Sequence, residues 1–265
     1  MSATPPPGRL LEIGCACCVF LDLARLLIFT FGNIISLNLS EQNHMNEKFA
    51  TLWKKFYRLN YYYHHDLEKL ASRLISSDSS IVEFSSKGGE LLSKLPNINK
   101  VGIEENEALV SLAKKRFKKT KFLDFKDYPQ NLTGLKFDYI LLSHTLSTIE
   151  DVQLFVRSLK RISHDDTRVI VTCFNFLWKP FFDFGEKLGQ ILPKTKEPNW
   201  LTTKDIENIF YLEGFEKIKS ENRFLLPFDI PYLSDLVNRI ISKFPVINSA
   251  CLINYSIFRP ISLKE

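Results

Sequence analysis

The sequence has few cysteines, and it lacks the paired CxxC elements that hold structural metals. Its five cysteines form an odd set, and three of them lie together as Cys15, Cys17 and Cys18. This pattern excludes a disulfide framework and a structural zinc site, so no metal ligand is assigned. The same pattern indicates a reducing compartment, and we expect a cytoplasmic protein.

Long uncharged apolar runs and a dominant charge sign are also missing. Residues 26–40 are uncharged, but a bilayer-spanning helix needs about 20 such residues. Glu12, Asp22 and Arg25 interrupt the early apolar region, which argues against a secretory signal. The net charge is +5, and acidic and basic residues alternate along most of the chain. We therefore expect no nucleic-acid-binding surface.

What is present is a chain of 265 residues that is 45% hydrophobic and 13% aromatic, enough to bury a full core. Segments that read as strands lie at 81–84, 99–103, 121–124, 137–142, 168–174, 215–222 and 251–258. Helical periodicity lies at 46–76, 88–95, 105–115, 150–162, 203–213 and 232–243. Strands that alternate with helices of this length predict a parallel, doubly wound sheet.

Residues 81–104 form the most informative unit. An apolar run ends near Glu83, a turn with Gly88 and Gly89 follows, and a second apolar run ends at Glu104. A strand, a tight turn, a helix and a parallel strand in this order hold a nucleoside-containing cofactor at the carboxyl ends of the strands. The turn reads Ser85-Ser86-Lys87, where a working site usually has glycines.

Over about residues 46–260 the order of segments resembles a class I S-adenosylmethionine-dependent methyltransferase. The resemblance implies an α/β, Rossmann-like doubly wound sheet of seven mostly parallel strands with an antiparallel last strand. Segments 215–222 and 251–258 would be the closing pair. It also implies S-adenosylmethionine as the cofactor and residues 45–265 as the domain, with helical cover segments at 175–200 and 225–248.

The resemblance also assigns the turn after the first strand. Glu83 takes the acidic position of the family's first motif, and Ser85, Lys87 and Gly89 stand at its three glycine positions. Ser85, Gly88 and Gly89 would then bind the methionine end of the cofactor together with Glu83. A structural role for Glu83, bonded to the backbone of the turn, is an equal alternative.

Three further residues are assigned by the same resemblance. Glu104 would accept hydrogen bonds from both ribose hydroxyls, as an acceptor-only carboxylate can. Asp124 would receive the adenine amino group, and His144 would lie at the mouth of the crevice as a candidate general base. The alternatives are exposed loop acids and a loop or cap histidine.

The second half has a narrower resemblance. Segments 175–216 and 223–260 look like a bacterial methyltransferase subgroup found beside glycosyltransferases of lipid-linked sugar assembly. This implies a small-molecule or lipid-linked glycan substrate and a glycosyltransferase partner. The aromatic, basic segments 174–187 and 224–244 could also contact a membrane interface, and a cover packed on the sheet is the alternative.

The first 44 residues form an N-terminal extension that has three interpretations. GRLLEIGCACCVFLDLAR matches a methyltransferase first motif, with Glu12 and Gly14 in place and Asn38 at the second acidic position. A truncated relic of a second domain, an apolar anchor helix over 8–40 and a natural start at Met45 all remain open.

Two functions compete on this evidence. The first is methyl transfer from S-adenosylmethionine to an oxygen or nitrogen of the acceptor, with His144 as the base. The second is a catalytically inactive binding or assembly protein, because a Cβ atom at Ser85 and Lys87 disfavours positive φ and obstructs the ligand. The Lys87 side chain could itself fill the methionine pocket.

Overall fold

A computed structural model describes residues 51, 53, 54, 57, 58, 60–180, 183, 199–226 and 230–262. The expected N-terminal extension, residues 1–44, lies outside these residues. Most of the expected cover segment 175–200 lies outside them too, including Phe181, Phe182, Phe184 and Lys187.

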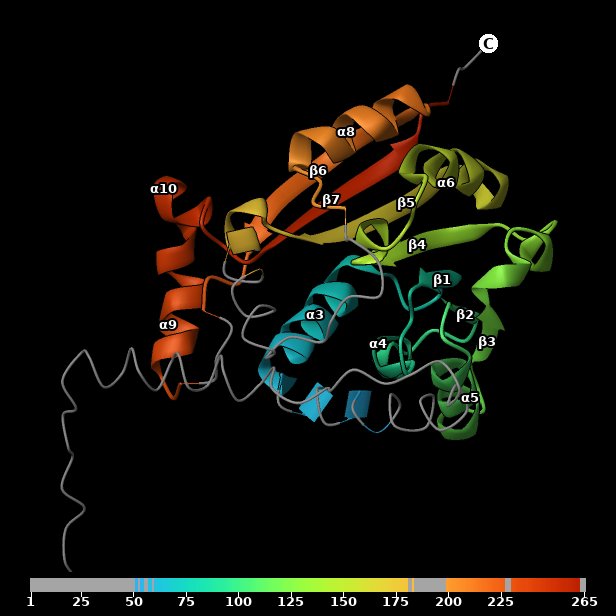
Figure 1. Ribbon diagram of the computed structural model, residues 1–265, viewed down its shortest axis with the longest axis horizontal. Coiled ribbons are helices and arrows are strands. Elements are labelled where there is room, and N and C mark those ends of the chain that lie inside the picture. Colours follow the sequence, from blue (N-terminus) through green and yellow to red (C-terminus); the bar gives the residue numbers. More distant parts are fainter. Residues whose placement is uncertain are drawn as a thin grey trace, which may run out of the picture.

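The described residues form one sheet with the strand order β3-β2-β1-β4-β5-β7-β6 (Figure 1). Its strands are β1 Ile81–Phe84, β2 Lys100–Glu104, β3 Lys121–Asp124, β4 Phe137–Ser143, β5 Ser163–Phe174, β6 Phe215–Arg223 and β7 Ile253–Pro260. Strands β1 to β5 pair in parallel, and β7 pairs antiparallel with both β5 and β6. The predicted α/β class and the antiparallel last strand are confirmed.

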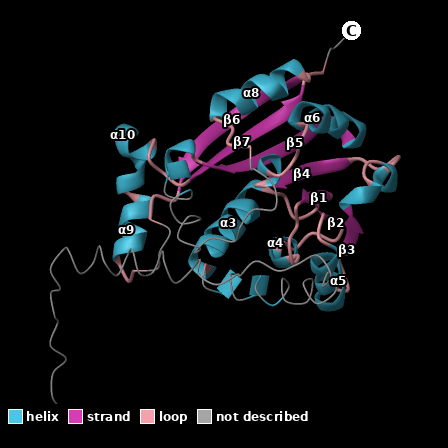
Figure 2. Cartoon of the chain, viewed as in Figure 1, coloured by secondary structure: helices cyan, strands magenta, loops and turns pink. Residues whose placement is uncertain are grey.

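Helices cover both faces of the sheet (Figure 2). Helices α3 Tyr61–Leu74, α4 Glu90–Lys94 and α5 Glu107–Arg116 contribute to the core on one face. Helices α6 Val152–Leu159 and α8 Thr203–Leu212 contribute to the core on the other face. Two further helices, α9 Leu233–Arg239 and α10 Pro245–Asn248, stand apart from these two layers.

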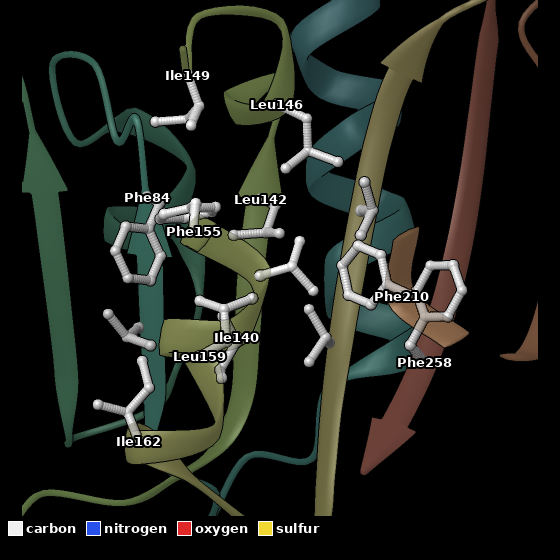
Figure 3. Close-up of a cluster of buried hydrophobic side chains, with 14 of the residues drawn as sticks. Phe84, Ile140, Leu142, Leu146, Ile149, Phe155, Leu159, Ile162, Phe210 and Phe258 are labelled. Atoms are coloured by element: carbon white, nitrogen blue, oxygen red, sulfur yellow. The ribbon is translucent and has the colours of Figure 1, made fainter. Parts of the chain in front are cut away.

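The central strands read as continuous apolar runs because both of their faces are buried. In β1, Val82 and Phe84 face α6 and α8, whereas Ile81 faces α3, α4 and α5. Figure 3 shows the larger core, where Phe84 meets Phe155 edge to face at a centroid distance of 5.1 Å. Alternate β1 side chains therefore enter different cores, and Glu83 shares the face of Ile81.

Local signals explain where α8 begins and ends. Thr202 and Asp205 form a reciprocal capping box, in which the Thr202 hydroxyl accepts from Asp205 N–H and the Asp205 carboxylate accepts from Thr202 N–H at 2.8 Å. Gly214 follows the helix with a φ of 72°, a conformation that glycine adopts without steric cost. The predicted helix 203–213 is confirmed within one residue.

Several predicted boundaries differ from the structure, and two of the differences have a local cause. Strand β5 begins at Ser163 and not at 168, because the polar residues 163–167 continue the strand beyond its apolar part. The predicted helix 232–243 is divided into α9 and the 3₁₀ turn η7, Ile241–Lys243. Phe244 then adopts an extended conformation, as a residue before proline prefers, and Pro245 starts α10.

Candidate functional site

The turn between β1 and α4 has a left-handed backbone at the three expected glycine positions, although only one of them is glycine. Ser85, Lys87 and Gly89 have φ angles of 53°, 54° and 80°. A residue with a Cβ atom occupies this left-handed region at a cost of roughly 1–2 kcal/mol. The backbone is therefore left-handed at all three positions that the resemblance assigns to glycine, and Ser85 and Lys87 bear the resulting strain.

Close packing explains why the glycine at position 89 is retained. A Cβ atom on Gly89 would lie 2.5 Å from Cζ of Phe122, and one on Gly102 would lie 2.5 Å from Cδ1 of the same ring. Real Cβ contacts are essentially never this short. A Cβ on Gly88 would lie 2.6 Å from the Glu90 carboxylate oxygens. The Phe122 ring of β3 thus packs directly against the backbone of the turn and leaves no room for a side chain at Gly89.

Glu104 connects this turn to the end of β2. Its side chain is buried, and Oε2 accepts from the Lys87 N–H at 2.6 Å while Oε1 accepts from the Asn106 N–H at 3.1 Å. Each carboxylate oxygen can accept a second hydrogen bond. The residue predicted to bind ribose therefore also holds the backbone at Lys87.

Asp124 lies at the end of the neighbouring strand, in register with Glu104. Its Oδ1 accepts from the Lys126 N–H at 2.8 Å and caps a short 3₁₀ turn, Phe125–Asp127. The strand order therefore brings the two predicted cofactor acids to adjacent strand ends. The capping bond shows that Asp124 has a structural role in addition to any ligand contact.

Glu83 has a carboxyl oxygen that no described residue satisfies. Oε1 accepts from the Ser143 hydroxyl at 2.8 Å, whereas the buried Oε2 has no hydrogen-bond partner in the described part of the chain. The pKa of Glu83 is raised to about 8, chiefly by burial and to a smaller extent by the charges of Glu104 and Glu90. The Ser143 bond and the Lys87 charge act in the opposite direction.

A third buried acid near the turn, Glu90, was missed by the sequence analysis. Its carboxylate accepts from Trp53 Nε1 at 3.1 Å and pairs with the Arg116 guanidinium. The only sequence signal was an acid in the first turn of a predicted helix, which is ordinary there because it suits the helix dipole. Trp53 and Arg116 carried no signal at all, because neither lies near Glu90 in sequence.

His144 follows β4 and lies in an aromatic pocket. Its ring stacks on Phe174 at a centroid distance of 4.1 Å, and Nε2 lies 2.5 Å from the Tyr63 hydroxyl. Nδ1 is buried and has no hydrogen-bond partner among the described residues. Burial lowers the pKa of His144 to about 3, with smaller contributions from Lys87 and His64. The imidazole is therefore neutral near pH 7.

Buried polar atoms without partners gather at this edge of the sheet. They are Glu83 Oε2, Ser86 Oγ, His144 Nδ1 and Thr172 Oγ1. They come from the carboxyl ends of β1, β4 and β5 and from the turn after β1, where the strand order reverses direction. Such switch points hold ligands in open α/β sheets, and buried polar groups nearly always have partners. The set fits a ligand with ammonium, carboxylate and hydroxyl groups.

The described part of the chain holds no group of three or more histidines, cysteines and acids placed to bind a metal ion. Within those residues, no helix combines the length and the apolar character needed to cross a membrane.

Comparisons with known proteins agree with this geometry. A family model described as a methyltransferase domain matches residues 1–220. No curated protein matches the sequence. A solved structure from Thermotoga maritima, described as an S-adenosylmethionine-dependent methyltransferase and possible histamine N-methyltransferase, is 18% identical, with a TM-score of 0.60 over 82% of this chain and 99% of that one.

A TehB-like S-adenosylmethionine-dependent methyltransferase from Corynebacterium glutamicum is also similar. It is 14% identical, with a TM-score of 0.52 over 82% of this chain and 99% of that one. A complex of the Trm112 activator and a methyltransferase from Haloferax volcanii gives 12% identity and a TM-score of 0.54, over 71% of this chain and 85% of that one. At these identities the likeness shows the fold alone.

Proposed function

This chain belongs to the methyltransferase domain family, and from that premise we propose that it transfers a methyl group to an oxygen or nitrogen of a small-molecule or lipid-linked glycan acceptor. S-adenosylmethionine is the cofactor that this family and its structural neighbours imply. When bound, it supplies a methyl group activated by a sulfonium centre. The observation that carries the proposal is the set of unpartnered polar atoms at the switch point of the sheet.

Three acids, Glu83, Glu104 and Asp124, would each bind a different part of the cofactor. Glu104 would accept from the ribose hydroxyls with the free lone pairs of its two oxygens, and Asp124, on the adjacent strand end, from the adenine amino group. Glu83 would accept from the cofactor's ammonium group through Oε2, and Ser85, Gly88 and Gly89 would form the turn around it. An ammonium group next to Glu83 would favour its ionised form.

His144 is proposed to position the methyl acceptor and to take its proton. Nδ1 has no partner among the described residues, and the ring is neutral near pH 7. In the tautomer whose Nε2–H donates to the Tyr63 hydroxyl, Nδ1 can accept a hydrogen bond from a hydroxyl or amine. A pKa of about 3 makes it a weak base. Proton removal must therefore accompany methyl transfer, and the main contribution of His144 is orientation of the nucleophile.

The glycan class of the acceptor rests on the resemblance of the second half of the chain to a subgroup associated with glycosyltransferases. A lipid-linked sugar offers hydroxyl nucleophiles, and the same resemblance suggests a glycosyltransferase as a partner. Co-purification of the two proteins from their natural source would test the partner. Assays on sugar-bearing acceptors would test the substrate class.

Calorimetric titration with S-adenosylmethionine and S-adenosylhomocysteine tests the central claim. We expect both ligands to bind to the full chain. Absence of binding at millimolar ligand would contradict the enzyme and favour the inactive binding or assembly protein. The titration needs only the wild-type chain and the two ligands, so its result does not depend on the identity of the methyl acceptor.

Lys87 provides a sharper prediction for the same titration. Its charge lowers the pKa of both Glu83 and His144, so its ammonium group competes with that of the cofactor for Glu83. Lys87→Gly removes this charge and the left-handed strain. We expect S-adenosylhomocysteine to bind about tenfold more tightly, equivalent to about 1.4 kcal/mol.

Tyr232→Gly is the matched control for this variant. Tyr232 also has a positive φ, 64°, and it is 95% exposed. The Tyr232→Gly variant therefore relieves similar backbone strain without removing a charge that acts on Glu83, and its affinity should equal that of the wild type. Weaker binding by Lys87→Gly would show that Lys87 holds the ligand and does not compete with it.

A further inference from the structure

The segment 232–248, which we call the α9–α10 arm, exposes an unusual amount of apolar surface. Six of its large apolar side chains are between 44% and 95% exposed: Tyr232, Leu233, Leu236, Ile240, Phe244 and Val246. Soluble monomers seldom expose large contiguous apolar patches unless these serve an interaction. The apolar side chains thus lie outward, unlike those of a cover packed on the sheet.

The arm has its polar side toward the protein. Ser234 and Ser242 are buried, and the Asn238 amide exchanges two hydrogen bonds of 2.9 Å with the backbone of Leu226. Asn248 Nδ2 donates to the Asn222 carbonyl of β6 at 3.2 Å. A surface helix normally turns its apolar stripe inward. This arrangement is reversed, so the outward face requires an apolar partner.

Spacing places the apolar residues of α9 on one face. Leu233, Leu236 and Ile240 are separated by three and four residues, the spacing that aligns side chains along a helix. Phe244 and Val246 continue the exposed surface past the turn into α10. The result is one outward surface and not a set of scattered contacts.

Charge distinguishes among the possible occupants. The arm holds two basic residues, Arg239 and Lys243, and one acid, Asp235. Asp235 pairs with Arg239 at 3.5 Å within α9, so Lys243 remains as the excess positive charge. Apolar and aromatic side chains flanked by basic ones suit the boundary between the acyl chains and the headgroups of anionic lipids. A second copy of this surface would instead oppose basic residues to one another.

The arm is attached next to the candidate crevice. Asn175 follows Phe174, on which His144 stacks, and its amide donates to the carbonyls of Ser249 at 2.6 Å and Cys251 at 2.8 Å. Figure 1 shows α9 and α10 beyond the end of the sheet where β5 ends. Phe176 and Leu177, both about half exposed, lie close by in sequence.

We propose that the α9–α10 arm docks on the surface of a membrane that contains anionic lipids, with the mouth of the crevice beside the lipid headgroups. The inference stands on exposure, reversed polarity and charge, and it does not depend on methyl transfer. Its relation to the proposed function is positional: an acceptor carried on a lipid would meet the site where the arm holds it.

Flotation of the full chain with lipid vesicles tests the proposal. We expect binding to vesicles of phosphatidylcholine and phosphatidylglycerol, weakening as salt is added, and little binding to phosphatidylcholine alone. The variant Leu236→Ser, Ile240→Ser, Phe244→Ser should lose at least tenfold in partitioning. Lys243→Glu should weaken binding to the anionic vesicles alone.

A double variant on α8, Tyr211→Ser with Leu212→Ser, is the matched control. These side chains are 70% and 69% exposed, and the control variant should float like the wild type. A wild type that stays in solution, or equal losses in the two variants, would overturn the proposal. So would a dimer in light scattering that the α9–α10 variant disrupts, because the surface would then bind a second copy.

Discussion

At the scale of single residues, three side chains of the candidate site sit on strained backbone. Ser85, Lys87 and His144 all adopt left-handed backbone conformations without being glycine. Such strain persists only where the surroundings determine it, and it concentrates at functional sites. The backbone of Lys87 is held in this conformation partly by the hydrogen bond from its N–H to Glu104. The backbone of His144 is held by strand β5, because its N–H donates to the Thr172 carbonyl at 3.1 Å.

Glu83 makes the stability of the protein depend on pH. Its pKa is about 8 when folded and about 4.5 when unfolded, so between these values the unfolded chain releases a proton that the folded chain keeps. The free energy of unfolding therefore has its full value below about pH 4.5, where Glu83 is protonated in both states, and it falls as the pH rises to about 8. Glu83→Gln should therefore be more stable than the wild type at about pH 8, by on the order of 2–4 kcal/mol.

Urea denaturation of both proteins across this pH range measures the effect, with the ligand-free chain. The control is Glu105→Gln, an exposed neighbour, which should follow the wild type at every pH. If wild type and Glu83→Gln keep a constant difference from about pH 4.5 to about pH 8, the carboxyl group is already ionised in the folded state.

At the scale of elements, the start of α4 depends on one glycine. Gly89 is the residue before the helix, it has a φ of 80°, and its backbone lies against the Phe122 ring. Both requirements exclude a side chain. Helix α4 is only five residues long, so its position depends on this contact more than on its own backbone bonds.

Gly89→Ala should destabilise the protein by about 2–4 kcal/mol, the sum of a left-handed alanine and an overpacked ring. Gly134→Ala is the matched control, because Gly134 has the same φ of 80° but no atom within 4 Å of its added Cβ. Chemical denaturation of the two variants separates the two costs. Equal losses would mean that the Phe122 ring moves aside freely.

Much of this element order could be predicted from the sequence, because buried parallel strands leave continuous apolar runs. The strand-end acids Glu83 and Glu104 were predictable for the same reason. The contacts that complete the site were not. Tyr63 meets His144 across 81 residues and Trp53 meets Glu90 across 37, and no local pattern records such pairs. Ser163–Thr167 of β5 was missed because its polar residues lack the apolar signal.

At the scale of the whole molecule, the sheet brings strand ends that are distant in sequence to one edge. Strands β1 and β4 are neighbours although β2 and β3 lie between them in the chain. A ligand that bridges this switch point would contact both halves of the sheet, so its binding free energy adds to the stability of the complete fold.

S-adenosylhomocysteine should therefore raise the melting temperature. At a hundred times its Kd it would add about 2.7 kcal/mol, which corresponds to roughly 5–10 °C for a chain of this size. Differential scanning fluorimetry measures the shift. Glu104→Gln should lose most of the shift, and an unchanged shift would contradict a ribose-binding role for Glu104. Because its NH2 group would face the N–H of Lys87 or Asn106, the melting temperature of the ligand-free variant should also fall, and the shift is measured from that lower value.

The position of β7 has a consequence for how the sheet is completed during synthesis. β7 lies between β5 and β6 but follows both in sequence. Until residues 253–260 have left the ribosome, β5 keeps an open edge and β6 has no neighbour in the sheet to pair with. Open strand edges are sites of mispairing with other chains. During synthesis the edges of β5 and β6 are therefore open to mispairing until β7 is available, and the insertion of β7 pairs both edges at once.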